Sequence, residues 1–483
     1  MQPPCAHEDT GLQLQALLEG QNYGAAAGEG TRCPAVPAPR NSPAVRDCLV
    51  VAVLCFGNLI NFMDWFIVPG ESLFSSSKEN VMFTLCYMLA APIFGYLGDR
   101  YNRKIILGAG ILFWSGVTLG SSFITEIFVL SRGLVGIGTA SYSTIAPTII
   151  ADLFEEGKRT TVLSIFYIFI PVGSGCGYML AAGMAKSTGD WHWAFRVSHS
   201  LSFSDTAESS PGFGFLTSIV LKEGSSAFPF PSTPFFLISL PCFLLTFSCS
   251  FVWSSLGLTA MAFVTGALGM WVPLFLYRAQ LVQGIVPPCL QESCNSSNSL
   301  IFGGITVGTG IVGVIAGAEA ARRLRKMYKK ADPLICATSM FTSSLCLYTA
   351  LMLAQTSILS TFIFIAFGEL FLSVNWAVVT DILLYVVTPR RQSTAIALQI
   401  LLSHLLGDAG SPYLIGAISN ALQARGAPSF QSSFRSIQSS FAICAFVGAF
   451  GGAFFLLTSL YIEGDRREAE SCHWHHCTMS PGD

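Results

Sequence analysis

The sequence predicts an all-α polytopic membrane protein. Of its 483 residues, 52% are hydrophobic and only 11% are charged, and the mean hydropathy is +0.57. Soluble domains carry about 25% charged residues, so this chain has too few charges to cover a soluble surface. Long apolar runs recur along most of the sequence, and the cations gather in the short segments between these runs.

Eleven apolar runs come close to the length of about 20 residues that a membrane-spanning helix needs. They lie at residues 47–69, 81–97, 105–124, 127–151, 161–185, 254–277, 300–321, 333–354, 358–388, 394–422 and 439–462. A twelfth candidate, at 235–253, follows several prolines and contains Pro241, which weakens a helix there. We therefore expect about twelve transmembrane helices, of which the sixth is doubtful.

The remaining segments divide the chain into two halves and two tails. Residues 1–45 are rich in Pro, Gly and Ala and lack a signal-peptide core, which predicts a disordered cytosolic tail. Residues 46–197 form the predicted N-terminal half with helices one to five. Residues 198–253 are a Ser/Phe/Pro-rich, atypical insert around the doubtful sixth helix. Helices seven to twelve occupy 254–462, and 463–483 are expected to form a cytosolic tail without a bound metal.

The distribution of cations orients the helices. Residues 322–330 hold six cations and no acid, while segment 278–299 is poor in cations. Positive loops stay in the cytosol, so the even-numbered hairpins are expected there. Further cations of this set are Arg100, Arg103, Lys104, Lys158, Arg159, Arg390 and Arg391.

Segment 278–299 is then expected on the lumenal side of the membrane. It contains Cys289 and Cys294, and Asn295 begins an Asn-Ser-Ser glycosylation sequon. A disulfide between the two cysteines and a glycan on Asn295 are both compatible with that side. Spacing alone does not decide whether the cysteines pair.

Ionisable groups inside the membrane are candidates for function, because each costs about 2.5–3.5 kcal/mol on insertion. In helix one, Asn61 and Asp64 recur on one face, and Arg132 stands in helix four. Asp64 and Arg132 are the opposite charges well inside the first half, so we expect them to face one cavity. A buried structural salt bridge is the alternative.

The second half contributes Glu369 in helix ten, with His404 and Asp408 four residues apart in helix eleven. Histidine titrates near neutral pH, which makes His404 a candidate for proton linkage. The alternative is an ordinary hydrogen bond between helices.

Residues 95–104, Gly-Tyr-Leu-Gly-Asp-Arg-Tyr-Asn-Arg-Lys, resemble the loop signature of the major facilitator superfamily. A generic basic hairpin is the alternative. The resemblance implies two bundles of six helices, and a weak internal repeat that matches Asp152 with Asp381 agrees with it. It also implies a cytosolic gate in which Asp99 lies near Thr394 at the start of helix eleven, and Arg103 meets Asp152. The implied gating set is Gly95, Asp99, Arg100, Arg103, Lys104 and Asp152.

Residues 61–64, 131–136, 140–148 and 408–413 resemble the spinster family of that superfamily. The resemblance implies a carrier of sphingolipids or lysophospholipids with a deep cavity between the halves, in the plasma membrane or an endolysosomal membrane. It places substrate-binding or coupling residues at Asp64 and Arg132. The full candidate set is Asn61, Asp64, Arg132, Thr139, Tyr142, Glu369, His404 and Asp408.

Two departures from the spinster pattern concern proton coupling. Thr139 stands where the family has a glutamate, and Trp65 replaces an arginine after Asp64. Both changes remove an ionisable group, which puts proton coupling by the usual route in doubt. Facilitated diffusion, or coupling through His404 or Glu369, becomes more credible.

The functional hypothesis is therefore lipid transport by alternating access, in a monomer without a cofactor and without a nucleic-acid partner. The sequence shows neither a nucleophile–base set nor a metal signature of the kind that would indicate an enzyme. A different class of function is a non-transporting membrane protein that binds partners, or a defective splice product of a transporter. Thr139 and the foreign segment 198–249 favour that alternative.

Overall fold

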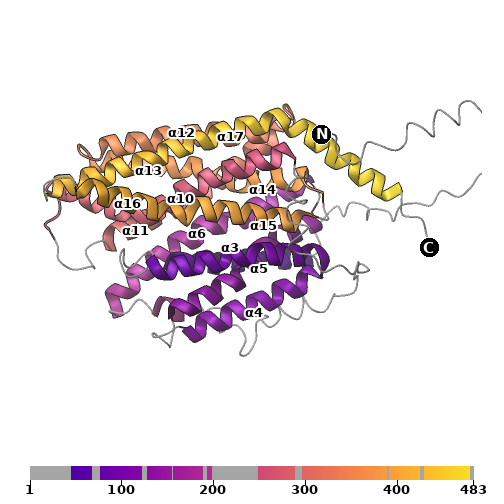
Figure 1. The fold of residues 1–483 in the computed structure, drawn as a ribbon, viewed down its shortest axis with the longest axis horizontal. Helices are drawn as coiled ribbons and strands as arrows, with labels where there is room; N and C mark the ends of the chain where they lie inside the picture. The colour runs from indigo at the N-terminus through magenta and orange to yellow at the C-terminus, as the bar shows by residue number, and fades with distance from the viewer. Residues whose placement is uncertain are drawn as a thin grey trace, which may run out of the picture.

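The computed structural model describes residues 45–67, 77–121, 128–154, 156–188, 193–197, 248–288, 296–388, 391–424 and 429–478. Within these ranges the regular structure is helical, without strands. The long helices lie side by side along one direction (Figure 1). The first of them, α2 (Val45–Ile67), begins at the same end of the bundle where the last, α17 (Phe430–Thr478), ends. The all-α membrane architecture that the composition predicts is confirmed.

In the part of the chain that the structure describes, five long helices build the N-terminal half. Helix α3 packs on α5, α4 also packs on α5, and α2 packs on α6. The hairpin between α3 and α4 is tight because the Asn102 side chain accepts a hydrogen bond from the Lys104 N–H (3.0 Å) and caps α4. The bounds are α2 (Val45–Ile67), α3 (Ser77–Arg100), α4 (Arg103–Ser121), α5 (Phe128–Leu153) and α6 (Glu156–Thr188).

The C-terminal half packs around the pair α10 and α17, which run against each other along most of their length. Helix α12 packs on α17 and α13 and completes the core of this half. The bounds are α10 (Cys249–Val282), α11 (Ser296–Leu324), α12 (Ala331–Leu353), α13 (Ile358–Ser373), α14 (Asn375–Val386), α15 (Gln392–Ser403), η3 (His404–Asp408), α16 (Gly410–Gln423) and α17 (Phe430–Thr478).

Each of the eleven expected apolar runs coincides with helix over most of its described residues. In the part of the chain that the structure describes, ten helices are long and apolar enough to cross a membrane, with α13 and α14 counted as one span. The run 394–422 was expected to be continuous and is broken into α15, η3 and α16. At the break, Gly407 has non-helical backbone angles (φ −98°, ψ −107°). The Ala409 N–H donates a hydrogen bond to the carbonyl oxygen of His404, five residues earlier, as in a π-helix.

The second half begins at Cys249, five residues before the expected start at 254. Ser248 caps α10 by accepting a hydrogen bond from the Phe251 N–H (3.4 Å), so 249–253 belong to α10 and not to the insert. The rest of the doubtful sixth helix, residues 235–247, lies outside the described residues, as do residues 1–44, Cys289, Cys294 and Asn295.

The expected C-terminal tail is instead a continuation of α17, which runs on to Thr478. No proline interrupts the sequence until Pro481, and several good helix formers follow Gly464. The Asp465 carboxylate accepts a hydrogen bond from the Ser250 N–H at the start of α10 (2.7 Å). The extension of α17 is thereby tied to the end of the bundle where α2 and α10 begin.

Candidate functional site

Arg132 and Asp64 lie together in the seam between α5 and α2. Their side chains are 1% and 2% exposed. An Arg132 Nη2 hydrogen donates to the main-chain oxygen of Asp64 (3.3 Å), and the guanidinium lies over the rings of Phe83 and Phe195, 4.9 and 5.2 Å from their centroids. The expected pair is brought together, but it is packed between helices rather than spread along an open cavity. Aromatic faces stabilise a desolvated cation in such a place.

Further polar groups of the candidate set lie in the same seam. Tyr142 donates to the carbonyl of Leu54, so its hydroxyl is used between α5 and α2. Asn61 and Thr139 are 2% and 0% exposed, and their side-chain polar atoms have no hydrogen-bond partner among the described residues. Leaving such a group unsatisfied costs about 1–3 kcal/mol. The seam thus holds polar groups that are available to a bound headgroup or to water.

His404 connects the two halves near this seam. Its Nδ1 lies 2.6 Å from Asp408 Oδ1. Its ring stacks on Trp65 of α2 (5.2 Å between centroids) and meets Tyr87 of α3 edge-on (4.8 Å). Trp65 in turn meets Phe83, the ring beneath Arg132. The His404–Asp408 pair of η3 therefore reaches the Arg132 cluster through two aromatic side chains.

Glu369 occupies a separate position within the C-terminal half. It is 8% exposed on α13, and its Oε2 accepts a hydrogen bond from the Thr306 hydroxyl of α11 (2.9 Å). The structure thus places this candidate on a helix pair other than that of Arg132 and Asp64.

The signature loop joins the halves at the end of the bundle where α2 begins. The Asp99 carboxylate accepts hydrogen bonds from the N–H groups of Ser393 and Thr394 (3.0 and 2.8 Å) at the start of α15. A helix N-terminus stabilises an anion at this position. Gly95 lies against the same turn, where an added Cβ would lie 2.8 Å from the Ser393 carbonyl oxygen. These contacts close α3 onto α15.

The cations of the loop have different partners. Arg103 donates to the Asp152 carboxylate at the end of α5 (2.6 Å) and to the Gly98 carbonyl (3.1 Å). The Arg100 guanidinium lies over the Tyr96 ring, 4.5 Å from its centroid. The contacts expected of Asp99 and Arg103 are therefore present, while the gating role of this set remains a prediction.

A second ion cluster at the same end escaped the sequence analysis. Asp381 of α14, with no exposed side-chain area, accepts hydrogen bonds from Arg159 Nε (2.9 Å), Thr160 Oγ1 (2.7 Å) and Arg325 Nη2 (2.7 Å). It joins α6 of one half to α14 of the other. The internal repeat that matches Asp152 with Asp381, together with the basic segment 322–330, was the signal that could have found it.

Arg325 extends this cluster to the link between α11 and α12. It also pairs with Asp332 (2.8 Å), which accepts a hydrogen bond from the Tyr385 hydroxyl (3.0 Å). Burial by itself lowers the pKa of Arg325, but the attraction of Asp381 and Asp332 outweighs burial and raises that pKa. Arg325 is therefore a fixed cation between two buried carboxylates.

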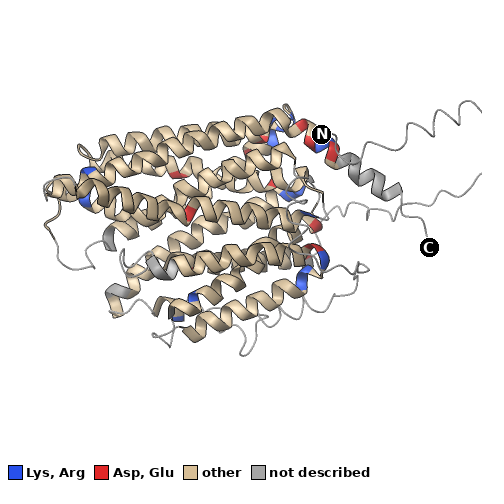
Figure 2. Cartoon of the chain, in the orientation of Figure 1, with Lys and Arg blue, Asp and Glu red and all other residues tan. Residues whose placement is uncertain are grey.

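Both ion clusters lie at the end of the bundle where α2 begins, and most of the charged residues gather there (Figure 2). The loops that follow α3, α5, α11 and α14 all meet there, as their mutual contacts show. We call this the basic end. The positive-inside rule predicts that it faces the cytosol. In this structure the two halves are joined at the basic end.

Comparisons with known proteins agree with this geometry. Residues 54–412 match the family model described as Major Facilitator Superfamily. The chain is 49% identical to protein spinster homolog 3 of Mus musculus over 97% of this chain and 94% of that protein. It is 52% identical to protein spinster homolog 1 of Bos taurus over 87% of this chain and 82% of that protein.

A similar solved structure is a bacterial homolog of the human lysosomal transporter Spinster in an inward-facing, unoccupied conformation. Its TM-score is 0.60 at 17% identity, covering 88% of this chain and 99% of that chain. At this identity the likeness shows the fold alone. The helices described above therefore share the overall fold of that structure.

Proposed function

The chain belongs to the spinster family of the major facilitator superfamily, and we propose that it carries single-chain lipids of the sphingolipid or lysophospholipid class. As a member of this family it is a multi-pass membrane transporter and not an enzyme. The proposed mechanism is alternating access, in which the halves rock about a site near the membrane midplane.

The observation that carries the lipid proposal is the buried seam around Arg132. A guanidinium binds a phosphate through two parallel N–H groups, and the aromatic rings of Phe83 and Phe195 offer apolar contact to a chain. Asn61 and Thr139 add polar atoms without partners among the described residues. A ligand with a phosphate head and one apolar tail matches this combination.

The test is flux of labelled sphingosine-1-phosphate and lysophosphatidylcholine into liposomes that contain the full chain. Arg132→Gln is expected to lower flux by about tenfold or more, because charge-assisted hydrogen bonds contribute about 1.5–3 kcal/mol. The matched control is Arg323→Gln, an arginine whose side chain is 78% exposed at the basic end and which should leave flux unchanged. Absence of flux for both lipids, with insertion verified, would overturn the proposal.

We further propose that any proton coupling runs through His404 rather than through position 139. Thr139 has no titratable proton, whereas His404 lies beside Asp408 at the contact of the two halves. The expected result is that His404→Gln abolishes the response of flux to an imposed pH gradient and preserves flux without the gradient. If only Glu369→Gln loses the response of flux to the pH gradient, Glu369 is the coupling residue and the proposal for His404 is wrong. Flux in the unaltered chain that ignores the gradient indicates facilitated diffusion.

Of the plasma and endolysosomal membranes, the latter is favoured for this chain. The similar bacterial structure is described as homologous to a human lysosomal transporter. Co-localisation of the tagged full chain with a lysosomal marker checks this placement, and labelling confined to the cell surface contradicts it.

The second candidate is a non-transporting membrane protein or a defective splice product, and Thr139 favours it. Replacing residues 198–249 with the matching segment of the mouse spinster homolog 3 separates the two candidates. Flux that appears only in the chimera supports the defective product, whereas equal flux in both chains supports the transporter.

A further inference from the structure

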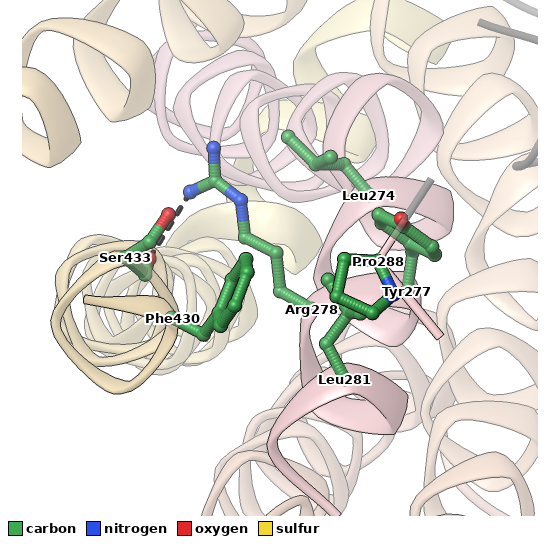
Figure 3. Close-up of a pocket in the computed structure, with 7 residues that line it drawn as sticks. All are labelled: Leu274, Tyr277, Arg278, Leu281, Pro288, Phe430 and Ser433. Atoms are coloured by element: carbon green, nitrogen blue, oxygen red, sulfur yellow. Dashed lines mark hydrogen bonds between the residues drawn. The ribbon is translucent and has the colours of Figure 1, made fainter. Parts of the chain in front are cut away.

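A cavity lies at the end of the bundle opposite the basic end. Helix α10 begins beside Asp465 at the basic end, so its last turns lie at the other end. Between those turns and the first turn of α17 is a cavity of about 270 Å³ (Figure 3). Its walls are Leu274, Tyr277, Arg278, Leu281, Pro288, Phe430 and Ser433.

The cavity carries positive charge. Arg278 Nη1 donates to the main-chain oxygen of Ser433 (3.1 Å), and no carboxylate of the described residues forms an ion pair with it. The guanidinium has five N–H donors, so several stay available to a ligand. The first turn of α17 contains no acid, and its N–H groups add partial positive charge at the same wall. The cavity is therefore suited to an anion.

The remaining walls are apolar and lie near the membrane surface. Leu274, Leu281 and Phe430 face the cavity beside the Arg278 stem, as Figure 3 shows. Helix α10 has 34 residues and is about 51 Å long, whereas the hydrocarbon core of a bilayer is about 30 Å thick. Because α10 begins at the basic end, we expect its last turns, which hold Arg278, to reach the headgroup region. The volume suits a headgroup rather than a whole lipid, so the acyl chains of a ligand stay in the bilayer.

We propose that this cavity binds the phosphate of an anionic phospholipid from the non-cytosolic leaflet. Arg278 holds the phosphate oxygens through charge-assisted hydrogen bonds, and Phe430 and Leu281 pack on the glycerol and the first methylene groups. The bound lipid joins the end of α10 to the start of α17, within one half of the transporter. It is a resident lipid and not the transported one.

The test measures binding of palmitoyl-oleoyl-phosphatidylglycerol to the detergent-purified full chain by native mass spectrometry, with the phosphatidylcholine of the same chains as comparison. The unaltered chain is expected to bind phosphatidylglycerol about tenfold more tightly, and Arg278→Gln is expected to abolish that preference. The matched control is Arg435→Gln, an exposed arginine of α17 that does not line the cavity. It should keep the preference.

A second variant guards against loss of folding. Phe430→Ala keeps the positive charge of Arg278 but removes one apolar wall of the cavity. It should weaken phosphatidylglycerol binding several-fold. The unfolding temperature should stay unchanged, because the Phe430 side chain is exposed. Equal lipid preference in the unaltered chain and in Arg278→Gln overturns the proposal. Displacement of the lipid by millimolar inorganic phosphate also overturns it, because the site would then be a simple anion site.

Discussion

Two aspartates that the internal repeat pairs with each other have different surroundings. Asp152 is 53% exposed and meets one arginine, whereas Asp381 is fully buried and meets Arg159 and Arg325. A surface ion pair contributes about 0–1 kcal/mol to stability. Removing one partner of a buried pair costs about 3–5 kcal/mol, because the other charge is left buried and uncompensated.

Asp381→Asn is therefore expected to destabilise the protein by about 3–5 kcal/mol, and Asp152→Asn by about 1 kcal/mol or less. Thermal unfolding of the two variants in the same detergent measures the difference. Equal shifts of the two unfolding temperatures would contradict the assigned burial of Asp381.

Asp99 is the residue on which the join between the signature loop and α15 depends. Its carboxylate accepts three hydrogen bonds, two from backbone N–H groups and one from the Thr394 hydroxyl (2.5 Å). Asp99→Asn removes the charge and turns one acceptor into a donor that faces other donors. We expect flux to fall about tenfold at near-normal abundance in the membrane, by analogy with other charge-assisted hydrogen bonds. Unchanged flux would refute a gating role for this loop.

At the level of elements, the approach of α3 to α15 depends on a residue without a side chain. A Cβ atom added at Gly95 would clash with the Ser393 carbonyl oxygen and the Ala397 side chain. A Cβ atom added at Gly116 would have no atom of a neighbouring helix within 4 Å. Gly95→Ala should therefore disfavour the conformation joined at the basic end, and Gly116→Ala should not. The readout is maleimide labelling of a cysteine introduced at Ser393, which is fully buried here. Faster labelling is expected in the Gly95 variant alone.

The break in the apolar run 394–422 shows where sequence patterns stop being informative. The run is mostly apolar on both sides of the break, and Gly407 is one of 45 glycines in the chain. Its special role comes from α10, because a Cβ at Gly407 would lie 2.9 Å from the Ala262 Cβ and 3.0 Å from the Thr259 carbonyl oxygen. A tertiary contact of this kind leaves no periodic signal. The break and the stacking of His404 on Trp65 therefore could not be predicted.

For the whole molecule, the sequence predicted the helical spans, because they follow from local composition. The contacts of the signature loop were implied by its resemblance to the major facilitator superfamily. The basic loops also meet at one end, as the positive-inside rule requires. The Arg132–Asp64 contact was predicted from two isolated charges. The Arg159–Asp381–Arg325 cluster was missed, because its members are up to 222 residues apart and meet only when the halves join.

The join at the basic end makes alternating access directly testable. Ideal Cβ atoms at Gly98 and Ser393 lie 3.2 Å apart, near the 3.5–4.5 Å of a disulfide. The double variant Gly98→Cys/Ser393→Cys should therefore form a bond that holds α3 on α15. We expect oxidation to abolish flux and a reductant to restore it, while either single variant transports under both conditions. Because a carrier that opens alternately to the two sides must separate these helices once per cycle, flux that persists in fully cross-linked protein would exclude the mechanism.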